Sequence, residues 1–185
     1  MAKPKEIKKK WVQVFSTQEF GNVEIGEIPY SEIKNTMGKI LRINLYLLTN
    51  DSRKQNSEIA FRIINADEKK ANTEIVDYRM LNAYLKRIIK KEKNKIDDSF
   101  TCETKDKVKI RVKPMMITKN KTKQSNLNRL RTHTREIFRD YSKSVDFGLI
   151  IKDLVNNSIQ RNIKQELKKV YPLNLFEIRD LSRIK

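Results

Sequence analysis

Four stretches of the chain alternate apolar and polar residues, or are rich in β-branched and aromatic residues, as β-strands are. They cover residues 11–15, 37–48, 58–64 and 71–77. Runs of this kind separated by short polar turns predict strands. Because sequential strands joined by short connections usually pair, we expect the last three to form an antiparallel meander. The intervening residues 21–29 carry two glycines and a proline, so we expect irregular chain there.

From residue 78 the apolar spacing changes to three and four, which predicts an amphipathic helix with Asp77 as its N-cap. A longer helix is expected from Ser125 or Asn126. Its apolar stripe falls at positions 127, 130, 134, 137 and 141. Two shorter helices follow over residues 144–154 and 159–170, and Pro172 ends the second. Residues 173–178 alternate weakly and are expected to return to the sheet.

After the alternating run over residues 11–15, the predicted order is therefore three strands, a helix, two strands (residues 99–103 and 107–113), three helices and a strand. This order defines an α+β fold with a mostly antiparallel sheet of about six strands flanked by helices. A chain of 185 residues is long enough for one sizeable core, so we expect a single domain over residues 11–185. Residues 1–10 form a basic N-terminal arm that we expect to order only against a partner.

The most regular alternation in the chain runs from Lys107 to Lys113 and reads Lys, Val, Lys, Ile, Arg, Val, Lys. In a strand its three aliphatic side chains share one face and its four cations share the other. The cations then stand about 6.6 Å apart in a row. Pro114 cannot donate to a ladder, so the strand pairing must loosen there or the strand must lie at an edge.

The net charge of the chain limits the kinds of molecule that it is expected to bind. The chain has 41 basic and 23 acidic residues, a formal net charge of +18. A charge of this size on a small protein favours nucleic acid as the partner, ahead of an anionic membrane or a merely solvated surface. No apolar run approaches the 20 or so residues that span a bilayer, and no apolar segment follows the basic start, so we expect an intracellular protein without a membrane partner.

The candidate RNA-binding residues are the basic side chains of the arm, of the first helix and its end, of the alternating strand, of the loop after it and of the long helix. They are Lys8, Lys9, Lys10, Lys86, Arg87, Lys90, Lys91, Lys93, Lys95, Lys107, Lys109, Arg111, Lys113, Lys119, Lys121, Lys123, Arg129, Arg131, Arg135 and Arg139. Arginine suits bidentate phosphate contact and stacking on bases, which singles out the long helix.

Catalytic groups are scarce. One histidine, His133, and one cysteine, Cys102, cannot form a nucleophile pair, an internal disulfide or a multi-ligand zinc site. We interpret His133 as a polar contact on a helix surface and Cys102 as a packed thiol. Four carboxylates could meet at strand ends around a metal ion, as in a nuclease, although turn formation and pairing with nearby cations explain them better. They are Asp97, Asp98, Glu103 and Asp106. We therefore expect no catalytic residue, no metal ion, no cofactor and no small-molecule substrate.

Five separate motifs resemble, in order and spacing, those of one ribosomal protein family. They are Lys10-Trp11 with Phe20 and Ile25-Gly26; Leu48-Thr49-Asn50-Asp51 with Lys54-Gln55; Ile96-Asp97 after a basic helix; Thr104-Lys105-Asp106 leading to Arg111-Val112-Lys113-Pro114; and Tyr171-Pro172-Leu173 with Ile178-Arg179. From about Lys8 to the C-terminus the chain resembles the e-S-one family of archaeal and eukaryotic small-subunit ribosomal proteins, S-three-A-e in older usage. It has Lys107 where the family usually has glycine. It also ends sooner than eukaryotic members, which favours an archaeal-type or otherwise reduced protein.

The resemblance implies a barrel-like sheet flanked by helices. It implies a place on the platform of the small subunit, near the 3′ end of the ribosomal RNA and the messenger exit, beside neighbouring platform proteins. It implies no catalytic residue. We therefore interpret the chain as a structural constituent of the small ribosomal subunit, located in the cytoplasm within the ribosome. A free nucleic-acid-binding regulator and a metal-dependent nuclease are the alternatives.

Overall fold

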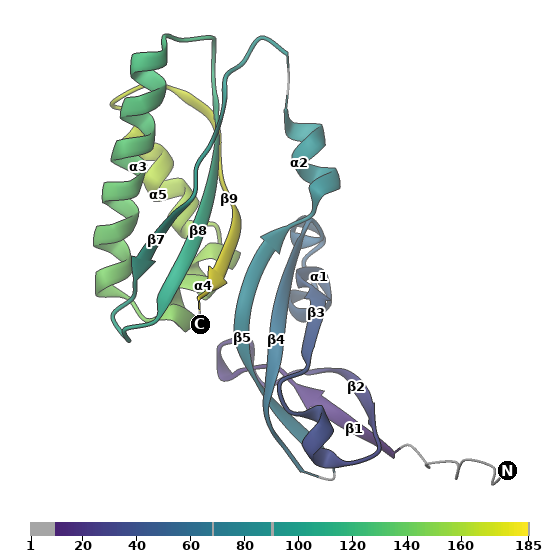
Figure 1. Ribbon diagram of the computed structural model, residues 1–185. Coiled ribbons are helices and arrows are strands. Elements are labelled where there is room, and N and C mark those ends of the chain that lie inside the picture. Colours follow the sequence, from purple (N-terminus) through teal and green to yellow (C-terminus); the bar gives the residue numbers. More distant parts are fainter. Residues whose placement is uncertain (1–9, 68, 90, 185) are drawn as a thin grey trace, which may run out of the picture. The chain divides into compact units, whose positions relative to one another are not determined.

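The computed structural model describes residues 10–67, 69–89 and 91–184 (Figure 1). The chain divides into two compact units. The first unit consists of two segments, the residues up to Gln55 and Ile59–Val76. The second unit consists of Asn56–Glu58 and the residues from Asp77 onward. Strands β4 (Ser57–Ala66) and β5 (Lys70–Met80) contribute to both units. The interpretation of residues 11–185 as a single domain stays a prediction.

The first unit is built on strand β1 (Lys10–Phe15), which is antiparallel to β2 (Glu24–Tyr30) and parallel to β5. Strand β3 (Ile40–Asn44) pairs with β4, and β4 pairs with β5. Alternation along β1 explains its core: Val12 and Val14 are buried, whereas their neighbours Trp11 and Gln13 are exposed. Buried residues from β2, β4 and β5 pack on these valines to complete one cluster; they are Tyr30, Ile63, Ala66 and Ala71.

Two predictions in this unit are wrong. Residues 24–30 form strand β2 rather than irregular chain, because β1 offers them a ladder that extends from Lys10 to Phe15. The strand expected over residues 37–48 ends at Asn44, and helix α1 (Leu45–Thr49) begins there. The Asn44 side chain accepts a hydrogen bond from the backbone N–H of Tyr46 at 2.9 Å, an N-cap that favours the helix over continued strand.

The second unit centres on strand β8 (Lys109–Thr118). One edge of β8 pairs in succession with β7 (Phe100–Glu103) and β6 (Lys95–Asp97), and the other edge pairs with β9 (Leu173–Arg183). The C-terminal part of β5 pairs with β9. All of these pairs are antiparallel. The 3₁₀-helices of the chain are Gln18–Phe20, Ile33–Thr36 and Ser52–Lys54.

Helices α3 (Gln124–Ser144), α4 (Phe147–Val155) and α5 (Ser158–Leu167) lie on one side of strands β7, β8 and β9 (Figure 1). The Phe138 ring of α3 meets the Phe100 ring of β7 edge-on, with 5.9 Å between centroids. The hydroxyl of Thr134 lies 3.4 Å from the sulfur of Met116. The α3 stripe is predicted correctly as far as Thr134, but Phe138, not Ile137, is the next fully buried residue.

Helix α2 spans Asn82–Ile88 and begins later than predicted, because Tyr78, Arg79 and Met80 continue strand β5. Arg79 and Tyr78 pair there with Asp180 and Leu181 of β9. The α+β class is confirmed. Across the described residues there are nine strands rather than about six, and their ladders do not close into the barrel that the resemblance implies.

Candidate nucleic-acid interface

Pro114 interrupts the sheet as the sequence predicts. On one side of β8 the register with β9 shifts between Lys113 and Pro114. On the other side the partner strand breaks, since β6 ends at Asp97 and β7 begins at Phe100. The backbone N–H of Asp98, inside this break, donates to the carbonyl of Pro114 at 3.2 Å. Proline therefore places Asp98 in a gap between two short strands.

Alternation along β8 separates an apolar face from a cationic face. Ile110 and Val112 are fully buried, and Val112 is paired with Phe100, whose ring contacts α3. Lys109 and Arg111 point to the opposite side of the sheet and are exposed. Among the described residues neither forms an ion pair, whereas Lys113 binds the carboxylate of Asp180 at 3.0 Å. Two of the predicted cations thus remain open to an anionic partner.

Lys107 does not belong to this row, because β8 begins only at Lys109. Its φ of 59° places it in the left-handed region, and its N–H donates to the carbonyl of Thr104 at 2.9 Å. The Thr104 hydroxyl contacts Asp106 and further secures the turn. The chain therefore makes the tight turn for which the family usually has glycine, and it does so with a lysine.

The arginines of α3 differ in their surroundings. Arg135 donates two hydrogen bonds to Asp98, from Nε to Oδ2 at 2.7 Å and from Nη2 to Oδ1 at 2.6 Å. These bonds lower the pKa of the Asp98 carboxyl and raise that of Arg135. Arg131 contacts Asn128 of its own helix. Arg129 and Arg139 are exposed, and no ion pair is formed by either within the described part of the chain.

The remaining candidates are scattered over the second unit, apart from Lys10 at the start of the first. Lys86, Lys91, Lys119, Lys121 and Lys123 are exposed and Lys93 is partly buried. Arg87 donates to the side-chain oxygen of Asn56 at 3.1 Å, and Lys95 binds Asp97 at 2.6 Å. Lys10 is the first residue of β1, opposite Tyr30, rather than part of an arm. Lys8, Lys9, Lys90 and the arm over residues 1–9 lie outside the described residues.

The acidic candidates do not come together. Asp97 faces Lys95 and, at 3.9 Å, Arg179, while Asp98 is held by Arg135. Asp106 lies in the turn with Thr104, and Glu103 is paired across the ladder with Lys109. Within residues 10–67, 69–89 and 91–184, no group of three or more histidine, cysteine, aspartate or glutamate residues could hold a metal ion. In the same ranges no helix is long and apolar enough to cross a membrane.

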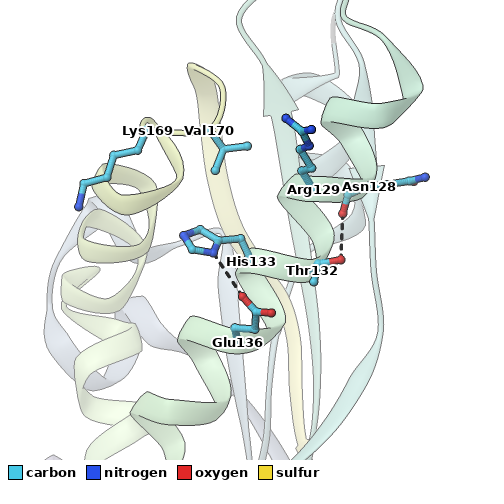
Figure 2. Close-up of a pocket in the computed structure, with 7 residues that line it drawn as sticks. All are labelled: Asn128, Arg129, Thr132, His133, Glu136, Lys169 and Val170. Atoms are coloured by element: carbon cyan, nitrogen blue, oxygen red, sulfur yellow. Dashed lines mark hydrogen bonds and ion pairs between the residues drawn. The ribbon is translucent and has the colours of Figure 1, made fainter.

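A pocket of about 590 Å³ lies between α3 and the chain that follows α5 (Figure 2). Successive turns of α3 contribute one wall, and Lys169 and Val170 contribute the other. The residues from α3 are Asn128, Arg129, Thr132, His133 and Glu136. Inside the pocket, Nδ1 of His133 lies 3.4 Å from Oε2 of Glu136. The polar contact predicted for His133 is present.

Sequence reasoning identified Arg129 and His133 but missed the remaining residues of this pocket. The spacing of Asn128, Thr132 and Glu136 at four-residue intervals places them on one face of a helix and could have been noticed. Lys169 and Val170 could not have been assigned to the same site, because only the packing of α5 beside α3 brings them there. Cys102 is partly buried, and burial raises the pKa of its thiol, in agreement with a packed rather than reactive cysteine.

Comparison with known proteins identifies the class. The model of the Ribosomal S3Ae family matches residues 2–185. The small ribosomal subunit protein eS1 of Nanoarchaeum equitans is 28% identical over 172 residues, covering 93% of this chain and 87% of the relative. The eS1 proteins of Saccharolobus solfataricus and Archaeoglobus fulgidus are 29% and 28% identical over 170 and 181 residues, covering 92% and 97% of this chain and 82% and 86% of the relatives.

The chain belongs to the Ribosomal S3Ae family. The resemblance drawn from the five motifs is confirmed, and so is the archaeal affinity of the sequence. Members of this family are structural proteins of the small ribosomal subunit, so the chain is a ribosomal protein and not an enzyme. The nuclease alternative is thereby excluded.

Proposed function

We propose that this chain binds the RNA of the small ribosomal subunit near its 3′ end, on the platform beside the messenger exit, with neighbouring platform proteins as further partners. The observation that carries the proposal is the pair Lys109 and Arg111. Both are exposed on a strand whose opposite face is fully buried. A rigid strand therefore holds two cations in place. Among the described residues neither forms an ion pair, and the nearest cross-strand carboxylate is Glu103, opposite Lys109 on β7.

The physical reason for an RNA partner is the unbalanced charge. With a net charge of +18, the folded chain repels itself, and a polyanion removes that cost. Binding phosphates also releases the counterions condensed on the nucleic acid, which makes the affinity strong at low salt and steeply salt-dependent. Phosphate contacts position a protein rather than read sequence, so recognition is of RNA shape.

The other open cations extend this surface. Arg129 and Arg139 on α3, together with the loop lysines, offer further phosphate contacts, and Lys107 adds a charge at the turn before β8. Arg135 is different: its Nε and Nη2 groups already donate to Asp98, so its first role is to hold the break between β6 and β7. Only its remaining N–H groups are available to RNA.

Charge reversal of the strand tests the proposal. The double variant Lys109→Glu, Arg111→Glu should fold normally, because both side chains are exposed, yet fail to enter small subunits that survive a high-salt wash on a sucrose gradient. The double variant Lys143→Glu, Lys152→Glu changes the net charge equally on exposed helix positions and serves as the control. Normal incorporation of the strand variant would refute the role of Lys109 and Arg111.

Two further measurements address the mechanism and the location. Removing two phosphate contacts should make the slope of log affinity against log salt shallower by roughly 1.4 to 1.8 for the strand variant. A photoreactive amino acid at position 111 should crosslink to the 3′ region of the small-subunit RNA in purified subunits. Crosslinks confined to another region would overturn the platform assignment while leaving RNA binding itself intact.

A further inference from the structure

One face of the β1–β2 ladder in the first unit is not covered by any other described element. The valines of β1 are buried, so the alternate residues Trp11 and Gln13 point to the opposite face. Across the ladder, Pro29 is opposite Trp11 and Glu27 is opposite Gln13, which places all four side chains on this outward face. Each of the four is exposed, and 61% of the Trp11 surface is open. We call these four residues the Trp11 face.

The Trp11 face combines an apolar surface with a carboxylate. Residues directly opposite each other in an antiparallel ladder have Cβ atoms roughly 5 Å apart, which applies to Trp11 and Pro29. Glu27 lies two residues before Pro29 on the same strand, so it is a diagonal neighbour of Trp11 at roughly 7–8 Å, within the reach of long side chains. A group bound at Trp11 is therefore close to an indole ring, a proline ring and a carboxylate.

The charge around the Trp11 face is opposite to that of the whole chain. Residues 11–33 include four glutamates and neither lysine nor arginine, although the chain carries 41 of those cations. The glutamates are Glu19, Glu24, Glu27 and Glu32. All four are exposed, and none forms an ion pair with another described residue. On the other side of β1, Lys70 of β5 is paired with Gln13, and its ammonium lies over the Phe15 ring, 5.5 Å from the centroid.

A basic protein segment fits this combination better than RNA does. Unpaired carboxylates repel phosphates, and an RNA strand has bases to stack on Trp11 but no cation for Glu27. The guanidinium of an arginine stacks on an indole, the aromatic ring that attracts cations most strongly, and it binds a carboxylate through its N–H groups. Tryptophan and arginine are also enriched among the residues that dominate the energy of protein interfaces. Charge complementarity therefore indicates a cationic protein partner.

We propose that the Trp11 face binds a basic segment of a neighbouring protein in the small subunit. An arginine or lysine of that segment stacks on Trp11 and pairs with Glu27. This inference rests on the proposed function, which includes neighbouring proteins as partners, and it gives them a surface of defined chemistry. The two kinds of partner are then separated by charge: RNA binds the cations of the second unit, and protein binds the acidic, aromatic face of the first.

Photocrosslinking in purified small subunits tests the partner. p-Benzoylphenylalanine in place of Trp11 should crosslink to a protein peptide that contains arginine or lysine, identified by mass spectrometry. The same photoreactive residue in place of Gln13 keeps Trp11 intact and should reach the same peptide, so the test does not depend on folding or assembly of a Trp11 variant. Leu149, 49% exposed on α4 in the second unit, is the control position and should not reach that peptide.

A charge change tests the pairing with Glu27. Combined with the photoreactive residue at position 13, Glu27→Lys should lower the crosslink yield about tenfold, because two cations would then face each other. Glu136→Lys makes the same change of charge on an exposed residue of α3 and should leave the yield unaltered. An equal yield in both variants would refute the charge complementarity on which the choice of partner depends.

Trp11 is the single tryptophan of the chain, so its fluorescence reports on this face alone. Acrylamide quenching of the free, full-length protein should stay the same when small-subunit RNA is added, because RNA binds elsewhere. Protection of Trp11 by RNA would overturn the inference and leave RNA binding intact. Unchanged RNA affinity of the double variant Lys109→Glu, Arg111→Glu would instead count against the proposed function alone.

The crosslinks themselves can also overturn the inference. Crosslinks from positions 11 and 13 to RNA would assign the face to nucleic acid. Crosslinks to residues 1–9 of the same chain would show that the basic N-terminal segment occupies it, and crosslinks to a second copy would indicate self-association. A partner peptide without arginine or lysine, or no crosslink from either position, would equally exclude a basic protein segment as the ligand.

Discussion

Replacing Glu177 by glutamine should make this protein more stable at alkaline pH and leave it unchanged in acid. Glu177 lies on β9 opposite Met115 of β8 and is partly buried. Burial raises the pKa of its carboxyl from 4.5 to about 7, and the nearby charge of Lys164 opposes the rise only in part. The carboxyl therefore holds its proton in the folded state at pH values where it would be ionised in the unfolded chain.

The sign and the size of this change in stability follow from the linkage between proton binding and folding. Between pH 4.5 and about 7 the folded state binds one more proton at Glu177 than the unfolded state does, so the free energy of unfolding falls as the pH rises. Each pH unit in this window costs about 1.4 kcal/mol, and the whole window costs on the order of 3 kcal/mol. Glutamine has nearly the same shape and carries no charge at any pH. It therefore avoids the loss.

Urea denaturation followed by circular dichroism at several pH values between 4 and 8.5 would measure this. The variant and the natural protein should agree near pH 4 and diverge through pH 7, reaching a difference of roughly 3 kcal/mol at pH 8.5. Comparing the two chains at each pH cancels the titration of their other groups. Glu103→Gln, on the exposed side of β7, is the control and should show no such divergence. A difference that stayed constant across the whole range would refute the reasoning.

Three other substitutions probe the scaffold. Asp98→Ala leaves Arg135 without its bidentate partner and should lower the free energy of unfolding by about 2 kcal/mol at pH 7, measured by urea denaturation. Because the folded state lowers the pKa of Asp98, this difference should disappear in acid, where the natural carboxylate takes up its proton. Lys107→Gly removes the side chain from a residue in the left-handed region and should raise the free energy of unfolding by about 1 kcal/mol. A decrease in stability would show that the backbone at this turn is not strained. Leu130→Ala empties a fully buried site on α3 and should cost about 2–5 kcal/mol, measured the same way.

The elements with long, regular patterns could be predicted from the sequence. The helix over Gln124–Ser144 and the strands around Ile59 and Ile110 carry clear apolar periods, and the weaker alternation from Leu173 was enough to predict the returning strand. Pro114 also predicted the break in strand pairing beside β8. Local choices between helix and strand were harder. Tyr78 to Met80 fit a helical stripe, but the edge of β9 holds them as strand, a tertiary preference that no local pattern contains.

Contacts between residues far apart in the sequence were the other feature that could not be predicted. Residues 24–30 have the composition of a loop and become a strand only because β1 pairs with them. In the candidate interface, the sequence shows where the cations are but not which are already occupied. Asp98 and Asp180 are 37 and 67 residues away from Arg135 and Lys113, so only the folded chain reveals those pairs.

The position of β9 has a consequence for the order in which the chain becomes structured during synthesis. Strand β8 ends at Thr118, whereas its partner β9 begins only at Leu173, with three helices between them. At about 5–20 residues per second, the 55 residues from 118 to 173 take roughly 3 to 11 s to make. During that interval one edge of β8, including the apolar residues Met115 to Ile117, has no strand to pair with. Such an edge is a template for association with other chains, so we expect the nascent protein to be most prone to aggregation in the interval before β9 is added.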